Sequence, residues 1–378
     1  MRLLELTSRG FRNLSSDVVS FGSGWNLVVG ENGQGKTNLL EAVALVCGQR
    51  SFRKASPAEM SADGESFRVG ARVRRGFATE DLAVEWSAGV GRRFRRAGKE
   101  ISFREASSLA PAVFLAPEHR ALLAGPPEER RRFLDRLVLG ARPAAGADLV
   151  RYERALRERN ALLARMQPDR RGERAPAGAS TPAKAELEAW TEELAIAGEA
   201  VRRHRREALK LFGDAFFELS EGAGPEYAAI SLSYSVEEGS DLRKTLEESL
   251  PVELLRGRTM AGPHRDDLVW RRAGAHLENR ASAGEIHRIV TLAKLAEWRV
   301  VRDAAGEPPL FGVDDFDAGL SARSLDGFFA GLPEGATVIL TTASDPSRFR
   351  GVAATVLPIA GGRPAAGEVR AGTGAKGT

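Results

Sequence analysis

Short hydrophobic runs and alternation of apolar and polar residues dominate the first 116 residues. Such spacing is typical of fully buried and half-buried β-strands. It predicts strands at 2–6, 17–21, 25–29, 67–73, 82–86, 92–96 and 112–115. Helical spacing interrupts this pattern at 38–45, directly after the third strand. The beginning of the chain therefore reads as a β-rich region that contains one early helix.

From residue 127 to about 217 the chain is charged and helical. Apolar side chains recur every three or four residues in two stripes, which predicts two amphipathic helices packed as a hairpin. The stripes are Leu149, Tyr152, Leu156, Leu163 and Met166, then Leu187, Trp190, Leu194, Ala197 and Val201. The segment 167–182 between them is rich in Pro, Gly, Ala and Arg, which predicts a mobile loop. Helices of this length are too short for a long coiled-coil arm.

Strand patterns return in the last third of the chain, at 229–235, 268–271, 310–313 and 336–342. A helix is predicted at 286–299. Gly and Ala dominate from 361 onward, and we expect 361–378 to be a frayed tail.

A P-loop lies between the strand at 25–29 and the helix at 38–45. Gly30, Gly35, Lys36 and Thr37 have the spacing Gly-x₄-Gly-Lys-Thr. Backbone N–H groups of such a loop face phosphates, its lysine reaches the β- and γ-phosphates, and its hydroxyl ligates Mg²⁺. A glycine-rich turn with a surface lysine is disfavoured, because both flanking elements are present. We expect ATP to contact Gly30, Glu31, Asn32, Gly33, Gln34, Gly35, Lys36, Thr37 and Asn38.

A second half of the site follows the predicted strand at 310–313. There Asp314 is expected to hold Mg²⁺, and Asp315 to orient or deprotonate the attacking water. The alternative is a strand followed by a helix-capping aspartate, which the P-loop and the further strand at 336–342 make less attractive. Lys36 and Asp314 lie too far apart in sequence for one compact nucleotide domain, so the helical segment between them is predicted to be an insertion.

The stretch Ala-Ser-Ala-Gly-Glu at 281–285 heads the helix predicted at 286–299. Ser282 and Gly284 have the form of an ABC-type signature, in which a hydroxyl and a backbone N–H meet a γ-phosphate bound by another subunit. Ser-x-x-Glu is also a capping box. The neighbouring P-loop and acidic strand favour the signature.

Composition limits the kinds of partner and the cellular environment that we expect for the chain. A formal net charge of +4 and a pI near 9.4 permit a nucleic-acid partner without requiring one. The single cysteine, Cys47, falls on the apolar face of the first helix and is expected in the core, so disulfides within the chain are excluded. No signal-peptide pattern or membrane-length apolar run occurs, and no His or Cys cluster has metal-ligand spacing. These features predict a soluble cytoplasmic protein.

Several stretches together resemble the RecF family, bacterial recombinational-repair ATPases of the SMC/ABC class. They are "RGFRNL", "NLVVGENGQGKTNLLEAV", "GQRSFR", "FLAPEHRALLAGPPEERRRFLD", "YERALRERNALL" and, most distinctively, "GPHRDDL" at 262–268. The likeness extends from residue 3 to about 345.

The resemblance implies an α/β fold, an ABC-type, SMC-like P-loop ATPase head with an inserted mainly helical lobe. The head would comprise 1–116 and 251–360, and the lobe 117–250. It further implies an ATP-dependent homodimer that binds duplex DNA near single-stranded gaps with little sequence specificity. Such a dimer works with the RecR and RecO mediators in RecA loading, as a slow, DNA-stimulated ATPase with ATP and Mg²⁺ as cofactors.

Individual arginines stay ambiguous. By resemblance to SMC-class heads Arg12 would touch nucleotide phosphate, and a solvated arginine is the alternative. Arg130, Arg131 and Arg132 would form a DNA-facing ridge or a solvated helix face.

One stretch departs from the family pattern. Where the family carries Ser-Glu-Leu-Asp, this chain has Ala318, Gly319, Leu320 and Ser321. The resemblance therefore supports ATP binding more strongly than it supports ATP hydrolysis or coupling between the two ATP sites of a dimer. Glu118 lies near the place of an ABC-type glutamine, but we assign it no role. Two further hypotheses therefore stand beside a RecF-type repair ATPase: a non-hydrolysing DNA clamp or scaffold, and an SMC-like ATPase of another defence or repair system.

Overall fold

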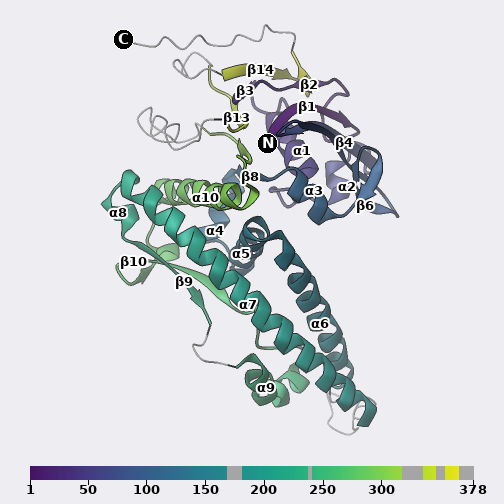
Figure 1. Ribbon diagram of the computed structural model, residues 1–378, viewed down its shortest axis with the longest axis vertical. Helices are drawn as coiled ribbons and strands as arrows, with labels where there is room; N and C mark the ends of the chain where they lie inside the picture. The colour runs from purple at the N-terminus through teal and green to yellow at the C-terminus, as the bar shows by residue number, and fades with distance from the viewer. Residues whose placement is uncertain (168–180, 237–240, 317–334, 346–353, 366–378) are drawn as a thin grey trace. The chain divides into compact units, whose positions relative to one another are not determined.

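The computed structural model describes residues 1–167, 181–236, 241–316, 335–345 and 354–365 (Figure 1). They form two compact units. The first comprises Met1–Arg120, Glu218–Tyr227 and Ala281–Thr378, and the second comprises Ala121–Phe217 and Ala228–Arg280. Both ends of the chain therefore build the first unit. The second unit continues past the predicted boundary at 250, because the strand at Asp267–Arg272 pairs with the strand at Ile230–Ser235.

A six-stranded sheet carries the P-loop in the first unit. Its order is β15-β14-β3-β13-β12-β8, and all neighbours are parallel except β15 with β14. The strands are β15 (Arg363–Pro364), β14 (Ala354–Ala360), β3 (Trp25–Val29), β13 (Val338–Thr342), β12 (Leu310–Val313) and β8 (Ala112–Leu115). Every residue of β8, β12 and β13 is buried, as near-continuous apolar runs predict for a parallel sheet covered on both faces.

An antiparallel sheet makes up much of the rest of the first unit, in the order β2-β1-β4-β5-β6-β7. Its buried and exposed residues alternate along β4, which confirms the alternation seen in the sequence. The strands are β2 (Val19–Ser20), β1 (Arg2–Arg9), β4 (Ser66–Arg75), β5 (Ala78–Ser87), β6 (Gly91–Arg96) and β7 (Lys99–Ile101).

Helix α1 (Lys36–Val46) contacts both sheets of the first unit, which explains why its residues from Leu39 onward are apolar except for Glu41. Cys47 at its end is buried, as predicted, and burial raises the pKa of its thiol to about 12. Gly312 of β12 makes room for the ring of Phe114 on β8 and for Leu40 of α1, since a Cβ there would lie 2.5 Å from the ring and 2.9 Å from a methyl carbon of Leu40.

The other helices of the first unit include α10 (Ala283–Ala305), which begins before the predicted 286 and packs against β8. Trp298 of α10 donates its indole N–H to the carbonyl of Pro309, just before β12. Short helices complete the unit: α2 (Pro57–Met60), α3 (Phe103–Leu109), η1 (Pro117–Arg120) and α8 (Pro225–Ala228, which spans the boundary at 227).

The second unit combines the predicted helices with a small sheet. The helices are α4 (Ala121–Ala124), α5 (Pro127–Ala141), η2 (Pro143–Ala145), α6 (Gly146–Arg165), α7 (Thr181–Ala223, whose last turns count with the first unit), α9 (Leu242–Arg256) and η3 (Leu277–Asn279). The sheet has the order β11-β10-β9, with β11 (Ala275–His276), β10 (Asp267–Arg272) and β9 (Ile230–Ser235). The two predicted stripes lie on α6 and α7, where Tyr152, Leu194 and Val201 share one core cluster. Most of the predicted loop at 167–182 lies outside the described residues.

Candidate nucleotide-binding site

The P-loop joins β3 to the first turn of α1. Gly33 and Gly35 have φ angles of 81° and 106°, which glycine adopts without the strain that other residues would meet. Helix α1 has no side-chain cap and no acidic residue in its first turn. Because the first N–H groups of a helix lack partners within it, this end is suited to an anion such as a phosphate.

Lys36 is buried, and its Nζ donates hydrogen bonds to the carbonyls of Gly30 and Glu31 at 2.8 and 2.9 Å. The ammonium is thus held over the loop by backbone oxygens. Glu31, Asn32 and Gly33 form the exposed part of the loop.

The hydroxyl of the P-loop residue Thr37 contacts Asp314, the first residue after β12. Thr37 donates from Oγ1 to Oδ1 of Asp314 at 3.1 Å, across 277 positions of sequence. Thr341, at the end of β13, donates to the same Oδ1 at 2.6 Å. The carboxyl ends of β3, β12 and β13 meet at one edge of the parallel sheet, which is where open α/β sheets bind ligands.

The Asp314 carboxyl is buried among hydroxyl donors. Burial raises its pKa to about 6, the hydroxyls of Thr341 and Thr37 oppose that rise, and the nearby charges of Asp315 and Glu118 add to it. Within the described residues Asp314 forms no ion pair. A divalent cation at this carboxylate would supply the missing positive charge.

Asp315 follows with a φ of 45°, a conformation that a non-glycine residue adopts only when its surroundings hold it there. Its backbone N–H donates to Oγ1 of Thr341 at 2.9 Å. Thr341 therefore fixes both aspartates. Its role was not predicted, although it stands at the end of a strand that the sequence identified.

The rest of the loop is held by side chains and by the last described strands. Asn38 donates to Oδ1 of Asn13 at 2.8 Å. Gln34 accepts hydrogen bonds from the backbone N–H groups of Gly361, on its side-chain oxygen, and of Gly362, on its carbonyl. The loop conformation thus depends on residues from both ends of the chain.

Arg12 forms an ion pair with the buried carboxylate of Glu41. Its Nε and Nη2 donate to Glu41 of α1 at 3.0 and 3.2 Å, and its Nη1 donates to the carbonyl of Glu59 at 2.9 Å. Ser51 donates a further hydrogen bond to Glu41. Arg12 is therefore not a solvated arginine, and its contact with nucleotide stays a prediction. Glu41 was not singled out in the sequence, although it is the lone polar residue of α1 after Asn38.

Ser282 caps α10. Its hydroxyl accepts from the N–H of Glu285, and the Glu285 carboxylate accepts from the N–H of Ser282, so the capping box is present. Ser282 and Gly284 are exposed, and a Cβ at Gly284 would meet no atom within 4 Å. This end of α10 is open to a partner, and its action on a second ATP stays a prediction. Residues 318–321 lie outside the described residues.

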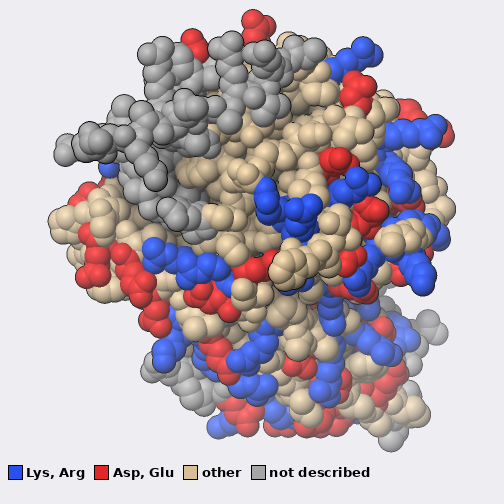
Figure 2. Space-filling model, turned by 45° about the horizontal axis from the view of Figure 1, so that its top comes forward, with Lys and Arg blue, Asp and Glu red and all other residues tan. Residues whose placement is uncertain are grey.

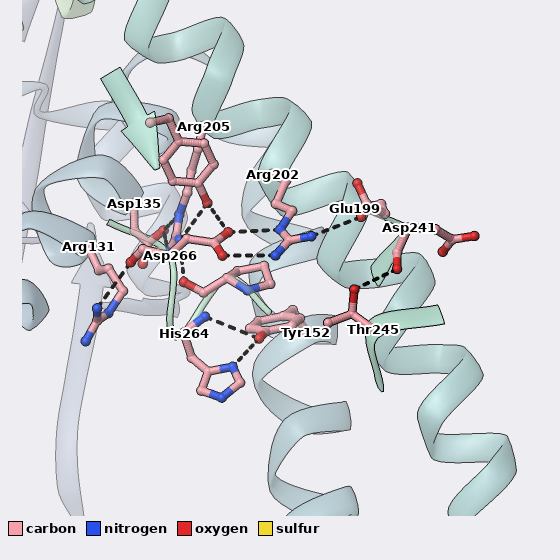
Figure 3. Close-up of polar contacts among 12 residues, drawn as sticks. Arg131, Asp135, Tyr152, Glu199, Arg202, Arg205, Asp241, Thr245, His264 and Asp266 are labelled. Carbon is pink, nitrogen blue, oxygen red and sulfur yellow. Dashed lines mark hydrogen bonds and ion pairs between the residues drawn. The ribbon is translucent and has the colours of Figure 1, made fainter. Parts of the chain in front are cut away.

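The distinctive stretch at 262–268 belongs to the second unit and is structural there (Figure 3). Asp266 accepts two hydrogen bonds from Arg202 and one from the hydroxyl of Tyr234. His264 lies beside Tyr152, whose oxygen is 2.6 Å from its Nδ1.

The triplet at 130–132 does not act as one ridge. Arg130 is buried and donates twice to Asp267, at 2.8 and 2.7 Å. Arg131 donates to the carbonyl of Asp266, and Arg132 is exposed beside Glu129. The expectation of a DNA-facing or solvated face is therefore wrong for Arg130.

The face drawn in Figure 2 has no continuous patch of one charge sign, because basic and acidic side chains are interspersed on it. In the antiparallel sheet, Arg68 and Arg95 pair with Glu85, and Arg96 pairs with Glu80. None of the helices within the described residues combines the length and apolar character that a membrane-spanning segment needs.

Comparison with known proteins agrees with this geometry. Residues 5–107 match the family model of an AAA domain. The chain is 31% identical to a DNA replication and repair protein RecF of Streptomyces avermitilis, over 91% of this chain and 94% of the relative. It is 34% identical to RecF of an Anaeromyxobacter species, over 90% and 92% of the two chains.

Solved structures give the same result. A recombination mediator protein RecF with ATP, of the RecFOR pathway, superimposes with a TM-score of 0.84 at 26% identity, over 95% of this chain and 96% of the other. An Smc head domain derived from Pyrococcus furiosus has a TM-score of 0.50 at 16% identity over 98% and 94%, which supports the fold alone. The predicted SMC-like head with an inserted lobe is confirmed, and the chain belongs to the RecF family of DNA replication and repair proteins.

Proposed function

We propose that this chain is an ATP-dependent DNA-binding protein of recombinational repair. As a homodimer it would clamp duplex DNA near single-stranded gaps and help RecA loading together with the RecR and RecO mediators. The observation that carries the proposal is the hydrogen bond between Thr37 and Asp314. It brings a P-loop hydroxyl and an acidic strand end into one site, as a Mg²⁺-dependent NTPase requires.

The residues at this site fit ATP with Mg²⁺. The left-handed glycines and the uncapped start of α1 suit phosphates, and the Lys36 ammonium lies within the loop. Thr37 and Asp314 present oxygen atoms, the ligands that Mg²⁺ prefers. Bound Mg²⁺ would supply positive charge to the β- and γ-phosphates.

The positions of the other predicted site residues suggest their roles in this proposal. Thr341 fixes the backbone of Asp315, so that this carboxylate can orient the attacking water. Ser282 and Gly284 would face the nucleotide of a second subunit, because they are exposed at the start of α10. Arg12 would keep its contact with Glu41 and use its remaining N–H groups on phosphate.

A hydrolysis-deficient clamp is the second candidate, favoured by Ala318, Gly319, Leu320 and Ser321 where the family carries Ser-Glu-Leu-Asp. It shares the ATP and DNA sites with the first candidate. The two candidates differ only in ATP turnover. A phosphate-release assay in the presence of DNA distinguishes between them.

The decisive experiment is binding to a gapped duplex with and without ATP. We expect ATP to tighten binding, Lys36→Ala to lose that effect, and Lys99→Ala, at an exposed lysine of β7, to keep it. If ATP leaves the affinity of the unaltered protein unchanged, the clamp proposal is rejected.

A further inference from the structure

A groove in the second unit, between α7 and β9, is separate from the nucleotide site. It has a volume of about 450 Å³, within the range of ligand-binding pockets. Leu209 and Phe216 of α7 and Ile230 of β9 are buried along it. Gly213 of α7 also lines it, and a Cβ there would meet no atom within 4 Å. The groove thus has an apolar floor and free space above one helical glycine.

Strand β9 borders this groove with an unpaired edge. It is the last strand of the order β11-β10-β9, and within the described residues β10 is the one strand that pairs with it. Leu232, Ser233 and Tyr234 line the groove, whereas Ser231 and Ser235 are exposed and do not. A free strand edge offers alternate N–H and C=O groups to another extended chain.

The groove is charged toward one end. Arg206 and Lys210, one helical turn apart on α7, are exposed and form no ion pair within the described residues. Arg205 donates to the hydroxyl of Tyr234, so this end of the groove lies near the end of β9, where Val236 also lines it. An acidic side chain at this end would find two cations.

From these features we infer that the groove binds an extended segment of a partner protein, added to β9 as a fourth strand. Alternate apolar side chains of the segment lie on Leu209, Phe216 and Ile230, and an acidic side chain of the segment lies between Arg206 and Lys210. A nucleic-acid backbone fits less well, because it cannot continue the strand hydrogen bonds and would meet the carboxylate of Asp214.

The test is selection of short random peptides displayed on phage against the full chain. Expected winners carry apolar residues at alternate positions and an Asp or Glu toward one end. One winner is then synthesised in two versions, with N-methyl groups on the odd or on the even residues. Since a β-strand presents successive N–H groups to opposite sides, we expect one version to lose binding about tenfold or more and the other to keep it.

Variants of the chain locate the site. Gly213→Leu fills the groove on a residue that a helix tolerates well, and Lys210→Glu reverses one charge. Both are expected to weaken peptide binding about tenfold or more. Arg203→Glu, at an exposed position of α7 that does not line the groove, is the matched control and is expected to bind normally.

Four results of the peptide experiments would overturn the inference. They are a selection that yields no such peptides, equal binding by the two N-methylated versions, normal binding by Gly213→Leu, and displacement of the peptide by a DNA duplex at similar concentration. Self-association that Gly213→Leu abolishes would also overturn it, in favour of a second copy of the chain as the occupant.

Discussion

The carboxylate of Glu41 is completely buried, and the guanidinium of Arg12 holds it through hydrogen bonds of 3.0 and 3.2 Å. Glu41 lies one turn beyond Thr37 on α1, on the same side of the helix. The ion pair therefore supports the helix directly beneath the site of the proposed Mg²⁺ ligand. It also gives Arg12 a structural role that is independent of any contact with phosphate.

Arg12→Met is expected to destabilise the first unit by about 3 kcal/mol, because it leaves a buried carboxylate without its cation. Chemical denaturation measures the loss. The double variant Arg12→Met/Glu41→Met removes both charges and should recover most of it. Arg72→Met, at an exposed pair with Glu5, should leave the midpoint unchanged. A phosphate role for Arg12 would show as an ATP affinity that stays low in the double variant.

Asp314→Asn is expected to stabilise the chain when Mg²⁺ and nucleotide are absent. The folded pKa of Asp314 is about 6 against 3.8 for the free side chain, so the folded state binds more protons between these values. Stability from this group therefore falls as pH rises through that window, and the loss is complete above it. We expect a gain of about 1–3 kcal/mol at pH 7 for the variant, measured by denaturation in chelator, and a smaller gain at pH 4. A variant that is less stable than the parent at pH 7 would contradict this account.

Arg130 and Arg132 are expected to respond very differently to the same substitution. Arg130→Met leaves Asp267 without the buried partner that donates to it twice, and should destabilise the second unit by about 3 kcal/mol. Arg132→Met alters an exposed side chain and should leave the unfolding midpoint unchanged. Thermal unfolding followed by circular dichroism compares the two, and equal midpoints would refute the structural role of Arg130.

The contribution of His264 to stability is expected to fall between pH 6.5 and pH 4, opposite in direction to the contribution of Asp314. Burial lowers its pKa to about 4, so the unfolded chain takes up a proton in this window while the folded chain does not. The neutral ring donates from Nε2 toward the carbonyl of Thr259, and Nδ1 accepts from Tyr152. The contribution is fully present above pH 6.5, amounts to about 3 kcal/mol, and is lost as pH falls to 4. In the Asp314→Asn background, which removes the opposing contribution, His264→Gln should flatten this part of the stability-versus-pH curve, and an unchanged slope would rule the histidine out as its cause.

Local sequence was enough to predict that Thr37 and Asp314 would lie together. Lys36 and Thr37 belong to a contiguous motif, and Asp314 follows a short, fully apolar strand. The edge of a parallel sheet then brings such elements together without further information. For this reason the hydrogen bond between Thr37 and Asp314 was within reach of the sequence, although 277 positions separate them.

Other contacts between distant elements could not be predicted from the sequence. Nothing near Arg12 in the sequence names Glu41 as its partner, and nothing near residue 250 shows that β10 will pair with β9. One sequence signal was overlooked. Arg130 shares the apolar stripe of α5 with Phe133, Leu134 and Leu137, which distinguishes it from the two arginines that follow it.

The hydrogen bonds from Gly361 and Gly362 to Gln34 have a consequence for the order in which the chain can fold during synthesis. The second unit is one continuous segment of sequence apart from 218–227, and the ribosome delivers it before the acidic strand of the first unit exists. Domains generally fold as they emerge, so the second unit can fold while β3 still lacks its neighbours β13 and β14. The nucleotide site is thus completed only after residue 362 has been synthesised, and a chain that stops before it cannot form the full contacts of the P-loop.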